Sequence, residues 1–517
     1  MARKILSCFA VMVVILCCSK LALAEKYEPS EKAADDSTVT VDQAADEIAG
    51  DTMPNKITAI DTYLDNSVDG VVMDDPNKPE QNKKTDTYEG IWSPATPINS
   101  HEASPWFNIA LIPGAEWPSL TGTWWGYRDK LKKKGITFTS SYVSDTQGNP
   151  TGGRMTGARY NHSIGADLNI NLEKLAKLQG LQFHISGIYR AGRNLSADVI
   201  GNKFTVSSIF GSEQVRLYNL YFQQDMFDNK FNLKVGRIAA GDDFCQSPLY
   251  WIFLQNGIDG CPISVPINFP FSVYPTAAWG ARAKLHITDT IQSMTGVYNG
   301  DPNVGRMAAH GMDFTMRLHR GVLVMQEFSY NPNTNKGDKG LPGHYKVGMY
   351  WHTGTAPDLS RDVDGGSYIL SAKPRAGHKG YYGMYIHADQ MIYREGAPHH
   401  YQGLTPFACL TLAPANTQIF PFFIDGGLIY RGLIPSRNHD LTAFGFVFGT
   451  WSRNLRQVAR DTGATPQKYE LALELTYRAS ITKWLFMQPD IQYIIHPGGT
   501  GDIPNALVLG WRVGVTF

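Results

Sequence analysis

Residues 469–478 read YELALELTYR, a stretch in which apolar and polar side chains alternate one by one. Successive side chains of a β-strand point to opposite faces of a sheet, so this stretch predicts a strand with two unlike faces. The apolar face consists of Tyr469, Leu471, Leu473, Leu475 and Tyr477, and the opposite face of Glu470, Ala472, Glu474, Thr476 and Arg478. Such a strand needs an apolar medium on one side and water or buried polar partners on the other.

The same alternation recurs along most of the chain. It is clear in SIGADLNINL (163–172), in AAWGARAKLHI (277–287) and in the final segment GWRVGVTF (510–517). Segments of this kind also begin near Ile136, Leu181, Val215, Phe231, Ile291, Met312, Val322, Tyr345, Tyr382, Phe407, Phe423, Ala443, Leu485 and Leu507. Because the segment that begins near Leu507 includes GWRVGVTF, this gives 17 candidate strands with residues 469–478 counted. Because bacterial membrane barrels usually have an even number of strands, we expect about 16, with 18 as the next choice.

Two folds are built from strands of this kind. A soluble sandwich buries the apolar faces between two sheets, whereas a transmembrane barrel turns them to lipid and encloses the polar faces. Charged inner faces, long strands and Tyr or Trp near strand ends favour the barrel. No segment after residue 24 is apolar enough to be a spanning helix, so a membrane role requires a barrel. We predict an all-β fold, an antiparallel transmembrane β-barrel over residues 105–517, whose terminal Phe517 signals to the barrel-assembly machinery.

The N-terminal part of the chain has a different composition. The start of the chain contains two basic residues, an apolar run over residues 5–18 and a small-residue motif that ends at Ala24. This pattern predicts a secretory signal peptide, residues 1–24, that is cleaved after Ala24. Residues 25–104 contain 18 Asp and Glu against 6 Lys and Arg, a net charge of −12, whereas residues 105–517 carry +9. We expect an exported protein of the bacterial outer membrane with an acidic, mostly disordered arm.

The cysteines that follow the signal peptide are Cys245, Cys261 and Cys409. Because an exported chain meets an oxidising compartment, Cys245 and Cys261 are candidates for a disulfide that closes a short loop. By loop entropy such a bond would stabilise the loop by about 3 kcal/mol. Cys409 is expected to be a small apolar residue without a reactive role.

Several longer stretches of the barrel region are those of one protein family. They are TWWGYRDKLKKKGITFTSSYVSD (123–145), NLEKLAKLQGLQFHISGIYRAGRNLS (171–196), LYNLYFQQDMFDNKFNLKVGRIAAGDDFCQSPLYWIFLQNGIDGCP (217–262), DGGLIYRGLIPSRNHD (425–440) and YELALELTYRASITKWLFMQPDIQYIIHPGG (469–499). In this order they resemble the carbohydrate-selective outer-membrane porins of the OprB type, from about residue 120 onward. The resemblance implies a 16-stranded porin, typically a homotrimer, through which glucose-like monosaccharides diffuse passively. It does not cover the acidic arm.

A sugar that passes a narrow pore loses hydration water, so the wall has to supply hydrogen-bond donors, acceptors and an aromatic face. Arginine offers several donors and carboxylates accept. We expect a constriction formed by Arg154, Arg190, Arg193, Trp279 and Arg282, with Glu213, Asp242 and Asp243 as acceptors. Strand alternation directs Arg282 inward and Trp279 outward, so Trp279 reaches the lumen only through a bulge or a reoriented loop.

Signals for other functions are weak. Glu470 and Glu474 could form a catalytic carboxylate pair, but balancing inward arginines such as Arg478 is the better interpretation. His399 and His400 read as a loop and not as metal ligands, and the basic residues are too dispersed for nucleic-acid binding. No nucleophile or cofactor motif is present. A porin for another small solute, and a barrel enzyme or adhesin with a plugged lumen, remain as alternatives.

Overall fold

The computed structural model describes residues 117, 119–210, 213–334, 338–396 and 402–517, and its main feature is one antiparallel sheet. The predicted signal peptide and acidic arm lie outside the described residues. The strands are β1 (Ile136–Thr151), β2 (Gly157–Asn171), β3 (Leu181–Gly192), β4 (Gln214–Met226), β5 (Phe231–Ile238), β6 (Ala278–His286), β7 (Ile291–Asn299), β8 (Val322–Tyr330), β9 (Gly343–Asp362), β10 (Arg375–Gln390), β11 (Tyr393–Arg394), β12 (Gly403–Leu412), β13 (Phe422–Arg431), β14 (Leu441–Thr450), β15 (Tyr469–Ser480), β16 (Leu485–Ile495) and β17 (Ala506–Thr516).

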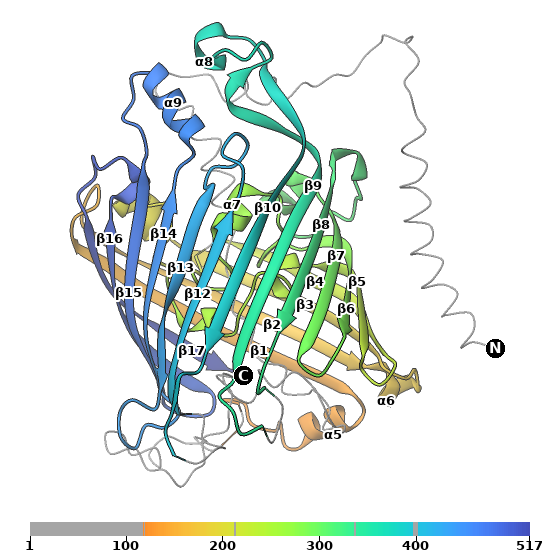
Figure 1. The fold of residues 1–517 in the computed structure, drawn as a ribbon. Coiled ribbons are helices and arrows are strands. Elements are labelled where there is room, and N and C mark those ends of the chain that lie inside the picture. Colours follow the sequence, from red (N-terminus) through yellow and green to blue (C-terminus); the bar gives the residue numbers. More distant parts are fainter. Residues whose placement is uncertain (1–116, 118, 211–212, 335–337, 397–401) are drawn as a thin grey trace, which may run out of the picture. The chain divides into compact units, whose positions relative to one another are not determined.

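The sheet closes on itself. Strand β17 pairs antiparallel with β1, with Ser141 opposite Thr516, and β1 pairs on its other side with β2. Strand β11 is only two residues long and lies beside β12, while β10 pairs directly with β12. The wall is therefore a closed antiparallel barrel of 16 strands, as the alternation predicts (Figure 1).

One of the candidate strands does not form. The segment near Met312 belongs to a loop, residues 300–321, that contains short 3-10 turns. Asp313 accepts hydrogen bonds from Thr315 and Arg306 and from Arg317, and this cluster of contacts folds the loop back on itself. The alternating Met and Phe residues of this segment thus lie on a loop, and the prediction of a strand there was wrong.

The helices are short and connect the strands. They are α5 (Tyr127–Lys133), α6 (Leu172–Ala176), α7 (Ser264–Asn268), α8 (Tyr368–Ser371) and α9 (Arg453–Asp461), with a π-turn η2 (Ser196–Ile200) and 3-10 turns η3 (Ala240–Asp242), η4 (Tyr250–Ile252), η5 (Pro302–Gly305), η6 (Met307–Ala309), η7 (Leu318–Arg320) and η8 (Pro497–Gly499). Among the described residues no helix is long and apolar enough to cross a membrane.

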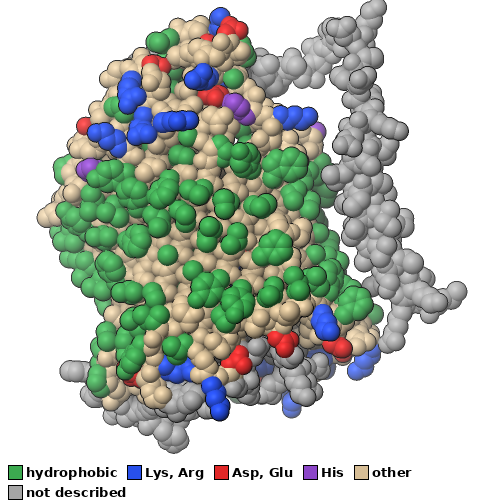
Figure 2. Space-filling model, viewed as in Figure 1, with side chains coloured by type: hydrophobic (Ala, Val, Ile, Leu, Met, Phe, Trp, Pro, Cys, Tyr) green, Lys and Arg blue, Asp and Glu red, His purple; other side chains and the backbone are tan. Residues whose placement is uncertain are grey.

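The two faces of the wall differ as the alternation predicts. In β17, Trp511 is 52% exposed on the outer face and its neighbour Arg512 is 2% exposed on the inner face. Hydrophobic side chains form a wide band around the middle of the visible face, with Lys and Arg above and below it (Figure 2). A band of this kind matches the hydrocarbon layer of a membrane, with charged residues in the head-group regions.

The two ends of the barrel differ in their connections. Helices α8 and α9 lie at one end, and α5 and the C-terminus lie at the other (Figure 1). The long connections, such as residues 239–277 and 300–321, belong to the α9 end, whereas connections such as residues 227–230 at the other end are short. Outer-membrane barrels have short periplasmic turns and long extracellular loops, so the α9 end faces the outside of the cell.

Two of the long connections fold into the lumen. Residues 193–210, the first inward loop, follow β3, and residues 239–277, the second inward loop, follow β5. They form a hydrophobic cluster with inner-face residues of the wall, which includes Val199, Phe204, Tyr250, Phe253, Ile258, Phe407, Phe423, Val447 and Ala472. Glycines in β14 make room for this packing, because a Cβ at Gly445 would lie 2.6 Å from a ring carbon of Phe253. The interior is therefore partly filled by the chain itself.

Candidate functional site: the constriction of the barrel

Glu470 holds the first inward loop against the wall. Its carboxylate accepts backbone N–H groups of Phe204 at 2.7 Å and of Lys203 at 2.9 and 3.0 Å. It also accepts the backbone N–H of Gly498, at 2.7 Å, from the connection that precedes β17. One inward carboxylate of β15 thus satisfies three backbone amides that lie away from water.

Glu474 holds the second inward loop in the same way. Its two oxygens accept the backbone N–H groups of Leu254 at 2.7 Å and Gln255 at 3.0 Å. The sequence predicts that Glu470 and Glu474 balance inward arginines such as Arg478; Glu474 interacts electrostatically with the inward Arg512, and Arg478 donates to the carbonyl of Trp251 at 3.4 Å. The two glutamates therefore act as loop anchors, because backbone amides of the inward loops lie opposite them.

Arg512 of β17 connects the wall to both inward loops. Its Nε and Nη2 donate to the carboxylate of Asp145 on β1 at 2.7 and 2.9 Å. Nη2 also donates to Ser208 Oγ at 2.7 Å, and Nη1 donates to Asp259 at 3.4 Å. Burial raises the pKa of Asp259 to about 7, although the nearby guanidinium opposes this shift. Arg512, on the polar face of the alternating segment 510–517, is thus the centre of an internal network.

A second charged network holds the start of the second inward loop. Asp243 accepts from Lys234 Nζ at 2.9 and 3.0 Å, and from Arg282 Nε at 3.1 Å. Burial alone would raise the pKa of Asp243, but Arg282 and Lys234 outweigh burial and lower this pKa to about 2. Next to it, Asp242 accepts from Tyr218 and from Asn219, and burial raises the pKa of Asp242 to about 6. Of the predicted set, Asp242, Asp243 and Arg282 therefore lie together.

Arginines of β3 and β4 form the next part of the inner wall. Arg190 is 2% exposed and Arg216 is 1% exposed, and in the paired strands Ile188 stands opposite Arg216. Arg190 Nη1 donates to the carbonyl of Phe210 at 3.3 Å, in the first inward loop. Arg216 Nη2 donates to the carbonyl of Gly305 at 2.7 Å, and its Nε has no hydrogen-bond partner among the described residues. These arginines therefore hold connecting loops against the inner wall.

Three predicted residues lie at the extracellular rim. Arg154 is exposed and donates to the carbonyl of Ala197 at 3.5 Å. Arg193 is exposed and pairs with Asp198 at 3.0 Å. Glu213 is also exposed, and Tyr189 donates to it at 3.5 Å. They are separated from the charged network of Asp243 because they follow or precede strands at the open end of the barrel.

Trp279 lies on the outer face. The pairing of β5 with β6 runs without a shift from Ile238 to Phe231, so no bulge turns the indole inward. Its ring centroid is 6.0 Å from that of Phe314, in the loop of residues 300–321. The structure therefore places this residue away from the lumen and corrects its assignment to the constriction.

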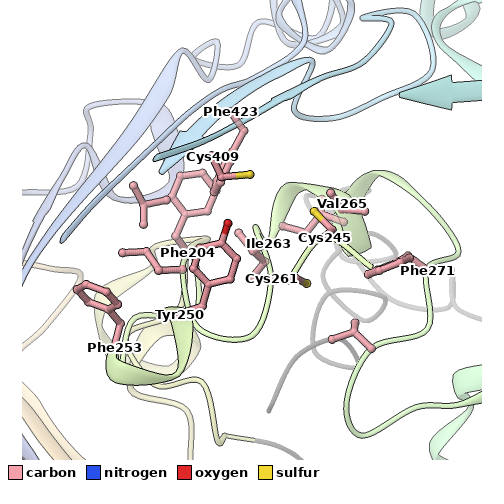
Figure 3. Close-up of a cluster of buried hydrophobic side chains, with 14 of the residues drawn as sticks. Phe204, Cys245, Tyr250, Phe253, Cys261, Ile263, Val265, Phe271, Cys409 and Phe423 are labelled. Atoms are coloured by element: carbon pink, nitrogen blue, oxygen red, sulfur yellow. The ribbon is translucent and has the colours of Figure 1, made fainter. Parts of the chain in front are cut away.

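The predicted disulfide is not formed. Cys245, Cys261 and Cys409 are all free thiols and all buried. They belong to the hydrophobic cluster of the second inward loop and the wall, where Cys245 and Cys261 stand on different parts of the loop (Figure 3). The backbone N–H of Cys245 donates to Tyr385 Oη at 3.1 Å and to Glu327 at 3.2 Å, which fixes this residue toward β8 and β10.

Several residues of the network were not predicted. Lys234 and Arg216 follow the same alternation as Arg282, so their inward direction was readable from the sequence. Their partners were not, because these come from loops distant in sequence. Among the described residues no group of three or more His, Cys, Asp or Glu side chains could hold a metal ion.

A closed barrel of 16 strands with an apolar outer band, a charged inner face and inward loops has the architecture of an outer-membrane porin. The family model of the carbohydrate-selective porins, the OprB family, matches residues 155–517, and the chain belongs to this family. It is thus a channel of the bacterial outer membrane and not an enzyme.

Individual relatives agree with this assignment. Porin B of Pseudomonas aeruginosa is 28% identical over 433 residues, which cover 79% of this chain and 93% of that protein. The high-pH structure of Pseudomonas putida OprB has a TM-score of 0.72 and 27% identity, over 78% of this chain and 99% of that chain. The low-pH structure of the same protein has a TM-score of 0.51 and 21% identity, over 77% and 98%.

Proposed function

We propose that this porin lets small neutral sugars, of the size of glucose, diffuse passively across the outer membrane. The observation that carries the proposal is the lumen itself, in which two inward loops face arginines of β3 and β4 within a carbohydrate-selective porin fold. The loops reduce the free cross-section, and the guanidinium groups offer donors to sugar hydroxyls.

The arrangement favours weak and reversible binding. Arg216 and Arg190 are buried in the inner wall, where the carbonyls of Gly305 and Phe210 hold their guanidinium groups, so they give the lumen a fixed positive potential. Asp242 and Asp243 keep their strongest contacts with protein side chains. A solute therefore passes charged groups that the protein itself already holds in place, which permits entry without trapping.

The test is single-channel recording of the mature protein in a planar bilayer, titrated with glucose and then with a disaccharide. We expect glucose to block the ion current saturably, and the disaccharide to block at lower affinity or not at all. Arg216→Ala should raise the half-blocking glucose concentration about tenfold, while Lys133→Ala, an exposed change on α5, should leave it unchanged. Channels that ignore sugars in both proteins would refute the sugar and support another solute.

Export and assembly complete the proposal. We propose that the signal peptide is cleaved after Ala24 and that residues 25–104 form an arm. We also propose that the assembly machinery recognises Phe517 and that the porin is a homotrimer. N-terminal sequencing of the protein purified from outer membranes tests the cleavage site. Native mass spectrometry in mild detergent tests the oligomeric state, and a mass of one chain would exclude the trimer.

A further inference from the structure

Helix α9 carries three arginines, of which Arg453 and Arg460 are exposed and Arg456 is half-buried. Their spacing of three and four residues puts them on one stripe of the helix. In the described part of the chain none of them forms an ion pair with a carboxylate; Arg460 contacts Gln457 at 3.5 Å, and Arg456 Nε has no hydrogen-bond partner. Three adjacent cations without anions destabilise a helix.

Other residues of α9 contact the rest of the barrel. Asn454 donates to Ser360 Oγ on β9 at 3.0 Å, and Asp461 accepts from Ser367 Oγ beside α8 at 2.5 Å. Leu455 packs against the hydrophobic cluster of the interior. Asp461, the one acidic residue of α9, also accepts from Gln457 at 2.7 Å and forms no ion pair with the arginines among the described residues. Arg453 and Arg460 remain exposed, and Arg456 between them is half-buried.

This stripe lies directly above the outer apolar band. Strand β14 ends at Thr450, just before α9, and β15 begins at Tyr469, after residues 462–468. The rings of Phe448 and Tyr469, on the outer faces of these strands, are 5.5 Å apart and mark the upper edge of the band. Lys and Arg gather above the hydrophobic band on this side of the barrel (Figure 2). At this height the head groups of the outer leaflet meet the protein.

We propose that the stripe of Arg453, Arg456 and Arg460 binds the phosphate groups of an outer-leaflet lipid whose head group is multiply phosphorylated. Guanidinium groups bind phosphate through paired hydrogen bonds and stay charged at any physiological pH. A single polyanionic head group would relieve the mutual repulsion of all three arginines, while its acyl chains would lie on the apolar band of β14 and β15. The lipid would thereby fix α9 on the rim.

The experiment measures binding of diphosphorylated lipid A to the full mature chain in mild detergent, by native mass spectrometry and by titration. The triple variant Arg453→Gln, Arg456→Gln, Arg460→Gln should bind about a hundredfold more weakly, since each basic residue near a lipid surface contributes about fivefold. The matched control is Lys130→Gln, Lys133→Gln, Lys134→Gln, three exposed lysines at the opposite end of the barrel. This control should bind like the wild type.

Two results with the arginine variant would overturn the proposal. One is equal lipid A binding by the wild type and the arginine variant, with both proteins folded as judged by heat-modifiable gel mobility. The other is unchanged lipid A binding together with lower anion selectivity in a neutral phosphatidylcholine bilayer, which would make the stripe a guide for anionic solutes. Monophosphorylated lipid A should bind more weakly than the diphosphorylated form, and equal binding of the two would also count against phosphate recognition.

Discussion

Strand β15 and strands β5 and β6 hold the same inward loop by opposite means. On β15, Glu474 is the charged partner and the loop contributes only backbone N–H groups. On β5 and β6 the wall contributes Lys234 and Arg282, and the loop contributes the carboxylate of Asp243. A buried charge can thus be satisfied by an array of amides or by an opposite charge. Anchoring by amides depends on the conformation of the loop, whereas anchoring by an ion pair depends on the ionisation of both partners.

The largest effect on stability and conductance is expected when the carboxylates that accept backbone amides of the inward loops are removed. The double variant Glu470→Ala, Glu474→Ala leaves five backbone amides without acceptors, three at Glu470 and two at Glu474. Each lost acceptor costs about 1–3 kcal/mol, so both inward loops should detach and the unfolding free energy should fall by at least about 5 kcal/mol. Single-channel conductance should rise several-fold, and urea unfolding in detergent measures the stability.

Glu173→Ala provides the control for this double variant. Glu173 accepts the backbone N–H of Gly180 at 3.0 Å, but in a turn at the opposite end of the barrel. It should therefore lower stability slightly and leave conductance unchanged. If the double variant also kept the wild-type conductance, hydrophobic packing would hold the loops. The carboxylates of Glu470 and Glu474 would then not be the anchors of the loops.

A smaller loss of stability is expected when Arg512, which contacts both inward loops, is replaced. Arg512→Met leaves Asp145 and Asp259 buried without their cation, which costs about 3–5 kcal/mol. The double variant Asp145→Asn, Arg512→Met removes one stranded charge and should recover part of this loss. Denaturant unfolding of both variants in detergent measures the difference. A double variant less stable than the single one would show that Asp145 has other partners.

The alternation of side chains predicted the barrel because it is a local property that each strand carries by itself. It also predicted the inward direction of Arg282 and Arg512. It could not predict which inward groups meet, since Asp243 and Glu474 find their partners through loops that fold across the lumen. The extra strand near Met312 failed for a related reason, because contacts of Asp313 within the loop override the alternation.

Docking of the second inward loop through Asp243 should depend on pH. Because the pKa of Asp243 lies at about 2, below its ordinary value of 3.8, docking of the loop is stabilised above pH 3.8. This contribution, about 2 kcal/mol, should be lost as pH falls from 3.8 to about 2. Asp242 acts in the opposite direction: its pKa of about 6 means that docking strengthens as pH falls from 6 toward 3.8.

Conductance measured from pH 7 to pH 2 checks this prediction. It should stay low or fall slightly down to about pH 4 and then rise as the loop is released. Asp243→Asn should show the high conductance already at pH 7, with no further rise in acid. An acid-induced rise of the same size in Asp243→Asn would assign the release to another group.

The smallest effect is expected at the rim, where an ion pair of similar chemistry is exposed. Arg193 pairs with Asp198 at 3.0 Å and its side chain is 70% exposed, whereas that of Arg282 is 5% exposed beside Asp243. Water screens an exposed pair, and Arg159 remains bound to Asp198 at 2.7 Å, so Arg193→Ala should cost less than about 1 kcal/mol. Glucose block of the channel should change less than twofold, against a much larger change in Arg190→Ala, because Arg190 holds the first inward loop through the carbonyl of Phe210. Equal loss of block in the two variants would place Arg193 in the path of the solute and move the constriction outward to the rim.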